Sequence, residues 1–384
     1  MDVMTPTTKP GIRVKKLAPE LRRRRINFSA IPELHLRFKA RLKYDSQFQR
    51  SLVQIAFLLL CIWIGIEFHY FVKWGMSRGA ETFIERPPGV EGFLPISALI
   101  SLKYWVETGI INSVHPSGLV IFLAIVAGSL ALKKSFCSWL CPIGTLSESL
   151  GMLGKKIFKR HFEPPRWLDY PLRSLKYLLL LFFGAAVWAM NSETLQAFIF
   201  SPYNKMADVK MYFFFAEITT GSIVTILVLM GLSMVIRNFW CRYLCPYGAL
   251  LGLTSLLSPL KIRRNASTCI DCELCTKVCP SRIKVHKVSS VRSDECTSCL
   301  QCVEICPVKQ TLEVRLPAAK KGVPTWALAA LVAFVFVAVT GLGMMSGHWK
   351  NGMTESEYLM RFPKIDSPMY QHARGSVPEY GPND

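Results

Sequence analysis

The chain has 384 residues, of which 51% are hydrophobic and 19% charged, and its mean hydropathy is +0.28. Its formal net charge is +20 and it contains 13 cysteines. A soluble globular domain is less apolar and carries about 25% charged residues. The composition therefore excludes a disordered protein, a secreted disulfide scaffold and a soluble enzyme with one core. It favours a membrane protein with a cysteine-rich part that faces water.

Apolar runs along the chain predict five transmembrane helices, since about 20 helical residues cross the hydrocarbon core of a bilayer. The runs are residues 51–72, 117–136, 175–190, 217–236 and 324–345. The third is short and needs its flanks, 172–192, to complete the crossing. A sixth stretch, 92–108, is interrupted by Pro95, Lys103 and Glu107. We expect an interfacial or re-entrant helix there.

Basic residues alternate between the two sides of these spans. Residues 1–50, 133–176 and 237–323 carry 13 basic and 4 acidic, 9 and 3, and 14 and 6 side chains, for net charges of +9, +6 and +8. The net charges of residues 73–115, 191–216 and 346–384 are 0, 0 and −1. Because Lys and Arg accumulate in cytoplasmic loops, the N-terminus is predicted to be cytoplasmic and the C-terminus periplasmic, in the inner membrane of a bacterium.

This topology also accounts for the high positive charge, which could otherwise indicate a nucleic-acid-binding protein. The run Arg22 to Arg25 resembles a nucleic-acid patch or a twin-arginine export signal. No apolar segment follows it promptly and no small-residue cleavage site appears. We interpret it as part of a solvated arm that meets acidic lipid headgroups, with no nucleic-acid partner.

The strongest motif is a cysteine run that occurs twice, 27 residues apart. The pattern C-x2-C-x2-C-x3-C-P covers Cys269 to Pro280 and again Cys296 to Pro307. A [4Fe–4S] cube needs four thiolates, and in two-cluster ferredoxins the fourth cysteine of each run binds the other cluster. The pattern therefore predicts one cluster on Cys269, Cys272, Cys275 and Cys306, and a second on Cys296, Cys299, Cys302 and Cys279.

Zinc is the alternative metal that paired C-x2-C motifs bind. Each run here has a third cysteine at the same step and a following proline, which favours iron–sulfur over zinc. The region 265–315 resembles the two-cluster ferredoxin domain. That resemblance implies a compact fold of paired short hairpins and helices.

A second pair of motifs, C-x-aromatic-L-C-P-x-G-x-L, follows the second and fourth predicted spans with an offset of 104 residues. It contains Cys137 and Cys141 in the first copy and Cys241 and Cys245 in the second. Cysteines at i and i+4 face one side of a helix, and the following proline and glycine turn the chain. These four thiols predict a third iron–sulfur site, with redox-active or structural thiols as the alternatives. Cys61, within the first span, is interpreted as a small packing residue.

Residues 50–320 resemble the membrane polyferredoxins of the NapH type and the membrane half of NosR-type proteins. Assembly proteins of the CcoG type have the same combination of membrane spans and cysteine motifs. The resemblance implies an integral membrane iron–sulfur protein that passes electrons between the quinone pool and a redox partner. The chain differs from the simplest pattern in its fifth span and its C-terminal tail on the far side, and it lacks the flavin-binding N-terminal domain of NosR-type proteins.

Other polar side chains are candidates for quinol, haem or copper sites. Five near the far ends of the spans could form a quinol site, ligate haem through the two histidines, or be hydrated in the headgroup zone: Glu67, His69, Glu107, His115 and Glu217. All predicted clusters lie at the cytoplasmic face, and one electron hop cannot cross a hydrocarbon core about 30 Å thick. A quinone pocket near Trp139, Tyr243 and the C-x3-C-P ends is therefore better placed. Trp139, Trp240, Tyr243 and Tyr247 could insulate a cluster or form an interfacial belt. The tail could bind copper through Met353, Met360, Met369, His348 and His372.

The predicted fold is an α-helical membrane protein with an inserted α+β domain for two [4Fe–4S] clusters. We divide it into a basic cytoplasmic arm (1–50), a membrane domain with the duplicated unit (51–260), a ferredoxin-type domain (261–318), a last span (324–345) and a non-cytoplasmic tail (346–384). The predicted function is single-electron transfer, as an electron-transfer subunit or a component of a quinol-linked oxidoreductase. Lys277 and Arg282 would tune the clusters. The alternatives are an assembly or regulatory factor that reduces a metal or a thiol, and a structural anchor.

Overall fold

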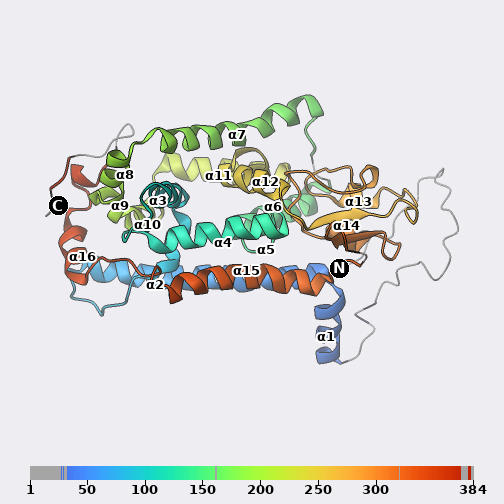
Figure 1. The fold of residues 1–384 in the computed structure, drawn as a ribbon, viewed down its shortest axis with the longest axis horizontal. Helices are drawn as coiled ribbons and strands as arrows, with labels where there is room; N and C mark the ends of the chain where they lie inside the picture. The colour runs from blue at the N-terminus through green and yellow to red at the C-terminus, as the bar shows by residue number, and fades with distance from the viewer. Residues whose placement is uncertain are drawn as a thin grey trace.

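The computed structural model describes residues 27, 29, 33–160, 162–319, 321–372 and 379–381. The run Arg22 to Arg25 lies outside the described residues. The molecule is an elongated helical bundle with a small irregular region at one end (Figure 1).

Three helices are long and apolar enough to cross a membrane. They are α2 (Ser46–Met76), α7 (Arg166–Ala189) and α15 (Thr325–Met345). Large apolar side chains on these helices face outward, among them Trp63, Phe182 and Phe334 at 62–66% exposure. Such surfaces are unfavourable in water and suit lipid. These three helices support the prediction of a membrane protein.

The other two expected spans are shorter than predicted. Helix α4 (Pro116–Leu132) has 17 residues, and α11 (Thr220–Val235) has 16. At 1.5 Å per residue these are about 26 and 24 Å long, less than the hydrocarbon core. Residues 217–219, expected to be helical, instead form a break at which α10 (Ala207–Ala216) and α11 meet at an 82° bend. The count of five spans therefore stays a prediction.

The remaining elements connect and cap these helices. The α-helices are α1 (Leu34–Tyr44), α3 (Pro95–Thr108), α5 (Phe136–Trp139), α6 (Pro142–Phe158), α8 (Ser192–Ile199), α9 (Pro202–Lys205), α12 (Pro246–Leu256), α13 (Leu274–Val278), α14 (Gln301–Ile305) and α16 (Glu355–Arg361). The 3₁₀ turns are η3 (Pro88–Phe93), η5 (Val285–Lys287), η6 (Phe362–Lys364) and η7 (Pro368–Tyr370), and η4 (Trp240–Leu244) is a π-helical turn.

The two ends of the bundle differ in character. Helices α1, α13 and α14 lie at one end, whereas α3, α8, α9 and α16 lie at the other (Figure 1). Helix α3, which covers most of the stretch 92–108, is seen almost down its axis, so it crosses the long helices rather than running alongside them. It packs against α4, α7 and α8 and has 14 residues, too few for a span.

The two copies of the 104-residue repeat pack reciprocally. In each copy an apolar helix is followed by the C-x3-C-P motif and a second helix, which are α4 and α6 in the first copy and α11 and α12 in the second. Helix α6 packs on α11 of the other copy, and α12 packs on α4. Gly154 of α6 lies so close to α11 that a Cβ there would overlap the carbonyl of Met234. This exchange brings both motifs to the centre of one interface.

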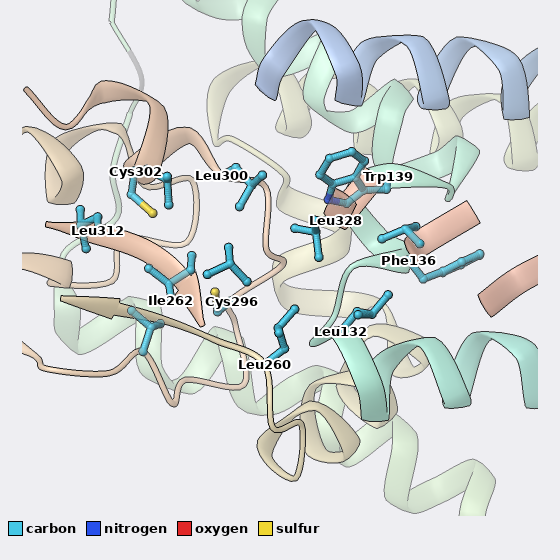
Figure 2. Packing of buried hydrophobic residues seen from close by; sticks show 14 of the residues in the cluster. Leu132, Phe136, Trp139, Leu260, Ile262, Cys296, Leu300, Cys302, Leu312 and Leu328 are labelled. Atoms are coloured by element: carbon cyan, nitrogen blue, oxygen red, sulfur yellow. The ribbon is translucent and has the colours of Figure 1, made fainter. Parts of the chain in front are cut away.

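One hydrophobic core continues from the bundle into the cysteine-rich region. It joins Leu132, Phe136 and Trp139 of the first repeat to Leu300 and Ile262 (Figure 2). Strands β1 (Lys261–Arg264) and β2 (Leu312–Arg315) form an antiparallel pair in that region. The cysteine-rich region is therefore packed directly on the helices, without an intervening linker.

Candidate metal centres

The two cysteine runs have the same backbone conformation. Asp271 and Glu273 have left-handed φ values of 50° and 59°, and Ser298 and Leu300, 27 residues later, have φ values of 51° and 61°. Each run then enters a five-residue helix, α13 or α14. The cysteine after each helix has an extended conformation. The left-handed residues curl each loop tightly around its three cysteines.

The structure brings the eight thiols together in two crossed sets. Each set lines a separate small cavity. One cavity is lined by Cys269, Cys272, Cys275 and Cys306, and the other by Cys279, Cys296, Cys299 and Cys302. Within the described ranges, no three His, Cys, Asp or Glu side chains converge as ligands of a single metal ion. Four thiols around a shared cavity suit the larger [4Fe–4S] cube.

Burial makes these thiols unfavourable as free anions. It raises the pKa of Cys279 to about 12, and repulsion from Cys299 adds to the effect. It also raises the pKa of Cys296 and of Cys306. Thiolates in these cavities therefore need a bound cation, because metal binding takes the deprotonated ligand.

The second pair of motifs does not form the continuous helix that the i, i+4 spacing predicts. Cys141 and Cys245 have extended backbones and are the N-caps of α6 and α12, with the proline as the first helical residue. Each sulfur accepts a hydrogen bond from the N–H of the glycine three residues on, at 3.4 Å from Gly144 and 3.2 Å from Gly248. A helix N-terminus favours negative charge, so both sulfurs are placed to act as thiolates.

These four cysteines line one cavity of about 1150 Å³. Its walls are apolar side chains of α2, α4 and α15, including Phe57, Ile121 and Phe336. Cys61 of α2 also lines it, and so does Cys299 of the neighbouring small cavity. Burial raises the pKa of Cys137 to about 12 and of Cys141 to about 11, and repulsion from Cys245 contributes to both shifts. This set, too, needs a cation to become thiolate.

Hydrogen bonds join the first C-x3-C-P motif to the adjacent cysteine loop. The Ser138 hydroxyl donates to the carbonyl of Thr297 at 2.6 Å, and the Trp139 indole N–H donates to that of Ser298 at 3.1 Å. Trp139 and Tyr243 are fully buried, so neither belongs to an interfacial belt. Trp240 and Tyr247 are half-buried. The loop between Cys296 and Cys299 is thus held directly against the motif that contains Cys137 and Cys141.

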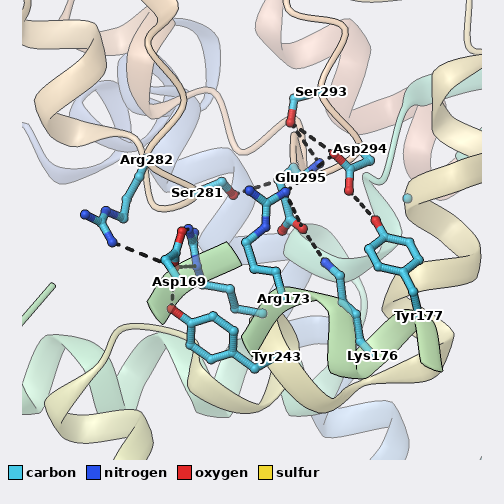
Figure 3. Close-up of polar contacts among 12 residues, drawn as sticks. Asp169, Arg173, Lys176, Tyr177, Tyr243, Ser281, Arg282, Ser293, Asp294 and Glu295 are labelled. Atoms are coloured by element: carbon cyan, nitrogen blue, oxygen red, sulfur yellow. Dashed lines mark hydrogen bonds and ion pairs between the residues drawn. The ribbon is translucent and has the colours of Figure 1, made fainter. Parts of the chain in front are cut away.

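A polar network fixes the cysteine-rich region to α7 (Figure 3). Glu295, the residue before Cys296, pairs with the fully buried Lys176 and with Arg173 at 3.2 Å. Tyr177 donates to the Asp294 carboxylate. Sequence analysis missed these groups, although a lysine inside an apolar span was a usable signal.

A second part of the network centres on Asp169. It accepts hydrogen bonds from Arg242 and Tyr243 and lies 3.8 Å from Arg282. Arg282 also contacts Glu163. Arg282 therefore secures the region against α7, and its role in tuning a cluster stays a prediction. Lys277 is exposed on α13.

The five polar residues near the far ends do not form one site. Glu67 is half-buried and lines the large cavity, whereas His69, Glu107 and Glu217 are exposed. His115 is 1% exposed, so it is not hydrated as one interpretation expected. One of its ring nitrogens contacts the carbonyl of Asn204 and the other faces Glu91 at 3.3 Å. The ring is thus enclosed between Asn204 and Glu91, which argues against haem ligation.

Glu91 is the centre of this far-end cluster. Although it is fully buried, Arg86 and His115 hold its pKa down at about 2 against the desolvation that would raise it.

The residues proposed for copper make other contacts. Met353 and Met369 pack in the nearby hydrophobic cluster, and His372 stacks on Tyr203. His348 contacts Ser346, and Met360 is 41% exposed.

The bundle and its thiol sets define a helical membrane protein that binds [4Fe–4S] clusters. A family described as a 4Fe-4S binding domain matches residues 114–161 and 218–265, which is the repeat with its 104-residue offset. A 4Fe-4S dicluster domain matches residues 261–307. Both matches agree with the cofactor expected from the cysteine spacing.

Similar proteins include the protein named "Putative electron transport protein YccM" from Escherichia coli, 47% identical over 84% of this chain and 91% of that protein. The chain belongs to the NapH/NosR-like polyferredoxin family, and its role is iron–sulfur electron transfer. NapH of Haemophilus influenzae is 26% identical over 50% of the chain and 64% of its own length. The regulatory protein NosR of Pseudomonas aeruginosa is 28% identical over 46% of the chain, but the match spans only 24% of NosR. No solved structure is significantly similar to the chain.

Proposed function

We propose that the chain is a quinol-linked electron carrier of the bacterial inner membrane. The observation that supports this most strongly is the cavity of about 1150 Å³ that the C-x3-C-P cysteines line. It is lined by all four C-x3-C-P cysteines, has apolar walls between the membrane helices, and reaches Cys299 of the neighbouring thiol set. An apolar substrate in the membrane and a cytoplasmic electron-transfer region would thus meet in one place.

Each proposed ligand set consists of cysteines that line one cavity. The first cluster takes Cys269, Cys272, Cys275 and Cys306, the second Cys279, Cys296, Cys299 and Cys302, and the third Cys137, Cys141, Cys241 and Cys245. When bound, the clusters supply one-electron redox steps. The protein holds the second and third sets close together through Ser138 and Trp139, which bond to the loop of the second set.

The quinone site is proposed at the cluster end of the large cavity. Phe57, Ile121 and Phe336 suit the isoprenoid tail of a quinone. Arg50 and Glu148 also line the cavity, and their side chains form a two-point ion pair. The buried Nε–H of Arg50 has no partner among the described residues. An unsatisfied buried donor costs about 1–3 kcal/mol, and a quinone oxygen would satisfy it.

The proposed orientation places the cysteine-rich region in the cytoplasm and α16 in the periplasm. The positive net charges of 133–176 and 237–323 support it. These segments contain the C-x3-C-P motifs and the ferredoxin-type runs. The partners are then membrane lipid, the quinone pool and a redox protein or complex subunit that meets the cytoplasmic end.

Anaerobic purification with iron and sulfide counting tests the cofactor content. Three cubes require about 12 Fe per chain, whereas two require about 8. EPR redox titration of the same sample identifies each cluster by its potential. Native membranes given a reduced quinol should reduce the clusters rapidly. Slow reduction in membranes that contain the full iron complement would contradict the quinol link.

The second candidate function is regulation or assembly, in which the chain reduces a metal or a thiol during maturation of another redox enzyme. The relatives named as regulatory proteins favour it. A respiratory carrier sustains steady electron flux from quinol to an acceptor, whereas a maturation factor does not. Continuous quinol turnover with an artificial acceptor therefore separates the two.

A further inference from the structure

Two consecutive buried lysines follow α4. Lys133 is 0% exposed and Lys134 is 3% exposed. In the part of the chain that the structure describes, neither ammonium has a carboxylate within ion-pair distance, and Asp294 and Glu295 act on Lys133 and Lys134 only from farther away. Burying an unpaired charge costs several kcal/mol, so each lysine needs another source of negative charge close by.

The two side chains reach different thiol sets. The Lys133 ammonium donates to the carbonyl of Ser293 at 2.9 Å, at the start of the loop that leads to Cys296, and it interacts electrostatically with the Cys296 sulfur. Lys134 lines the large cavity together with the C-x3-C-P cysteines, and it interacts electrostatically with the sulfur of Cys137, the carboxylate of Glu295, and the sulfurs of Cys245 and Cys241. Lys176 is also near Lys134, but Glu295 compensates its charge.

A strained backbone at Lys133 directs the two lysine side chains toward different thiol sets. Lys133 has φ 61° and ψ −167°, a region that is essentially restricted to glycine and costs about 1–3 kcal/mol. The Lys133 N–H donates to the Ser258 hydroxyl at 3.0 Å, and that hydroxyl donates to the carbonyl of Ala131 at 3.0 Å. The surrounding structure therefore holds a conformation that the local sequence disfavours.

The second repeat has a neutral residue at the position that corresponds to Lys134. Asn238 is the residue 104 positions after Lys134, and it lines the same cavity. Arg237, the counterpart of Lys133, bonds to Gln301 at 3.1 Å and lies 3.8 Å from Glu148. The charge at position 134 is thus specific to the first repeat.

We propose that Lys133 and Lys134 each tune one cluster, raising the reduction potential of the cluster held by the Cys296 set and of the cluster held by the C-x3-C-P set, respectively. The inference rests on the ligand sets of the proposed function. One-electron reduction adds a negative charge to a cluster, and a fixed cation in a poorly hydrated interior stabilises that added charge. Each lysine is a positioning residue that acts through the cluster beside it.

EPR redox titration of the anaerobically purified full chain tests the proposal. Lys134→Asn, which introduces the residue of the second repeat, should lower the potential of the third cluster only. Lys133→Met should lower that of the second cluster only. We expect at least a tenfold change in the reduced-to-oxidised ratio at fixed potential, which corresponds to about 59 mV for one electron. Lys155→Met, which removes an exposed charge on α6, should shift neither potential.

Charge-retaining variants separate electrostatics from packing. Lys134→Arg and Lys133→Arg should keep the potentials close to those of the unsubstituted protein. Loss of the third cluster in Lys134→Asn would overturn tuning as the role of Lys134, because its charge would then be needed to retain the cluster. Unchanged potentials in the neutral variants, or equal shifts in the arginine variants, would overturn the proposal. An iron content of about 8 per chain in the unsubstituted protein would remove the third cluster and the role of Lys134, while Lys133→Met still decides the role of Lys133.

Discussion

At the scale of single residues, the cysteines and the atoms that touch their sulfurs determine the chemistry. The crossed arrangement is the feature that is easiest to test. Cys279 belongs to the first run in the sequence but shares its cavity with Cys296, Cys299 and Cys302 of the second. Variants that remove two cysteines together can therefore show which ones share a cluster.

The double variant C279S/C302S should lose one cubane signal, because both ligands would belong to one cluster. The double variant C275S/C279S should lose two, since it removes one ligand from each. Iron counting and EPR of the anaerobic proteins measure the difference, about 4 against about 8 Fe lost per chain. The opposite ranking would mean that each run holds its own cluster.

The two motif glycines form a natural matched pair. A Cβ at Gly144 would overlap the carbonyl oxygen of Cys137, whereas a Cβ at Gly248 would meet the Cys245 sulfur at an ordinary 3.5 Å. Gly144→Ala should therefore displace the backbone of the first motif and destabilise the fold by about 1–3 kcal/mol. Gly248→Ala should be close to neutral. Denaturation midpoints and third-cluster EPR intensity provide the comparison, and equal effects of the two substitutions would contradict the geometry.

At the scale of elements, α7 supplies the docking surface for the cysteine-rich region. On this side the contact is electrostatic, through Lys176, Arg173 and Asp169. Along the core shared with α4 and α15 it is hydrophobic. Because Glu295 adjoins Cys296, its ion pair also fixes the start of that cysteine loop.

Glu295→Gln should destabilise the protein by about 3–5 kcal/mol, because it leaves the buried Lys176 without its charge partner. The double variant E295Q/K176M removes both charges and should recover part of that loss. Chemical denaturation in detergent and limited proteolysis of the region 261–315 measure both effects. A double variant that is less stable than Glu295→Gln would indicate that the ion pair is not the cause.

At the scale of the whole molecule, the large cavity connects the membrane helices to the cysteine-rich end. Gly341 of α15 lines it, and a Cβ there would meet no atom within 4 Å. Gly184 of α7 has equally open surroundings but does not line the cavity. A substitution at Gly341 therefore narrows the cavity without a backbone clash, and the same substitution at Gly184 is its matched control.

Gly341→Leu should slow cluster reduction by quinol at least several-fold, while iron content and cluster potentials stay unchanged. Gly184→Leu, with the same change of residue in a helix, should leave the rate unchanged. Stopped-flow reduction of purified protein by a soluble quinol measures both rates. Equal rates for the two variants would place quinol oxidation outside this cavity.

The repeats and the cofactor class follow from the sequence alone. Cysteine spacing is a local property, and the offsets of 27 and 104 residues are visible without any fold. The apolar runs likewise predict α2, α7 and α15. The length of α11 was overestimated, because the sequence shows an apolar run but not the bend before Thr220.

Only the tertiary structure decided which groups come together across the chain. The interpretation of Cys61 as plain packing missed that it lines the large cavity. The strained turn at Lys133 and the burial of Lys176 depend on partners more than 100 residues away, Ser258, Ser293 and Glu295. Covalent spacing determines which ligands can wrap one cluster, whereas the burial of charge depends on packing between distant segments. The sequence therefore determined the redox chemistry, and the fold determined how each site is connected and charged.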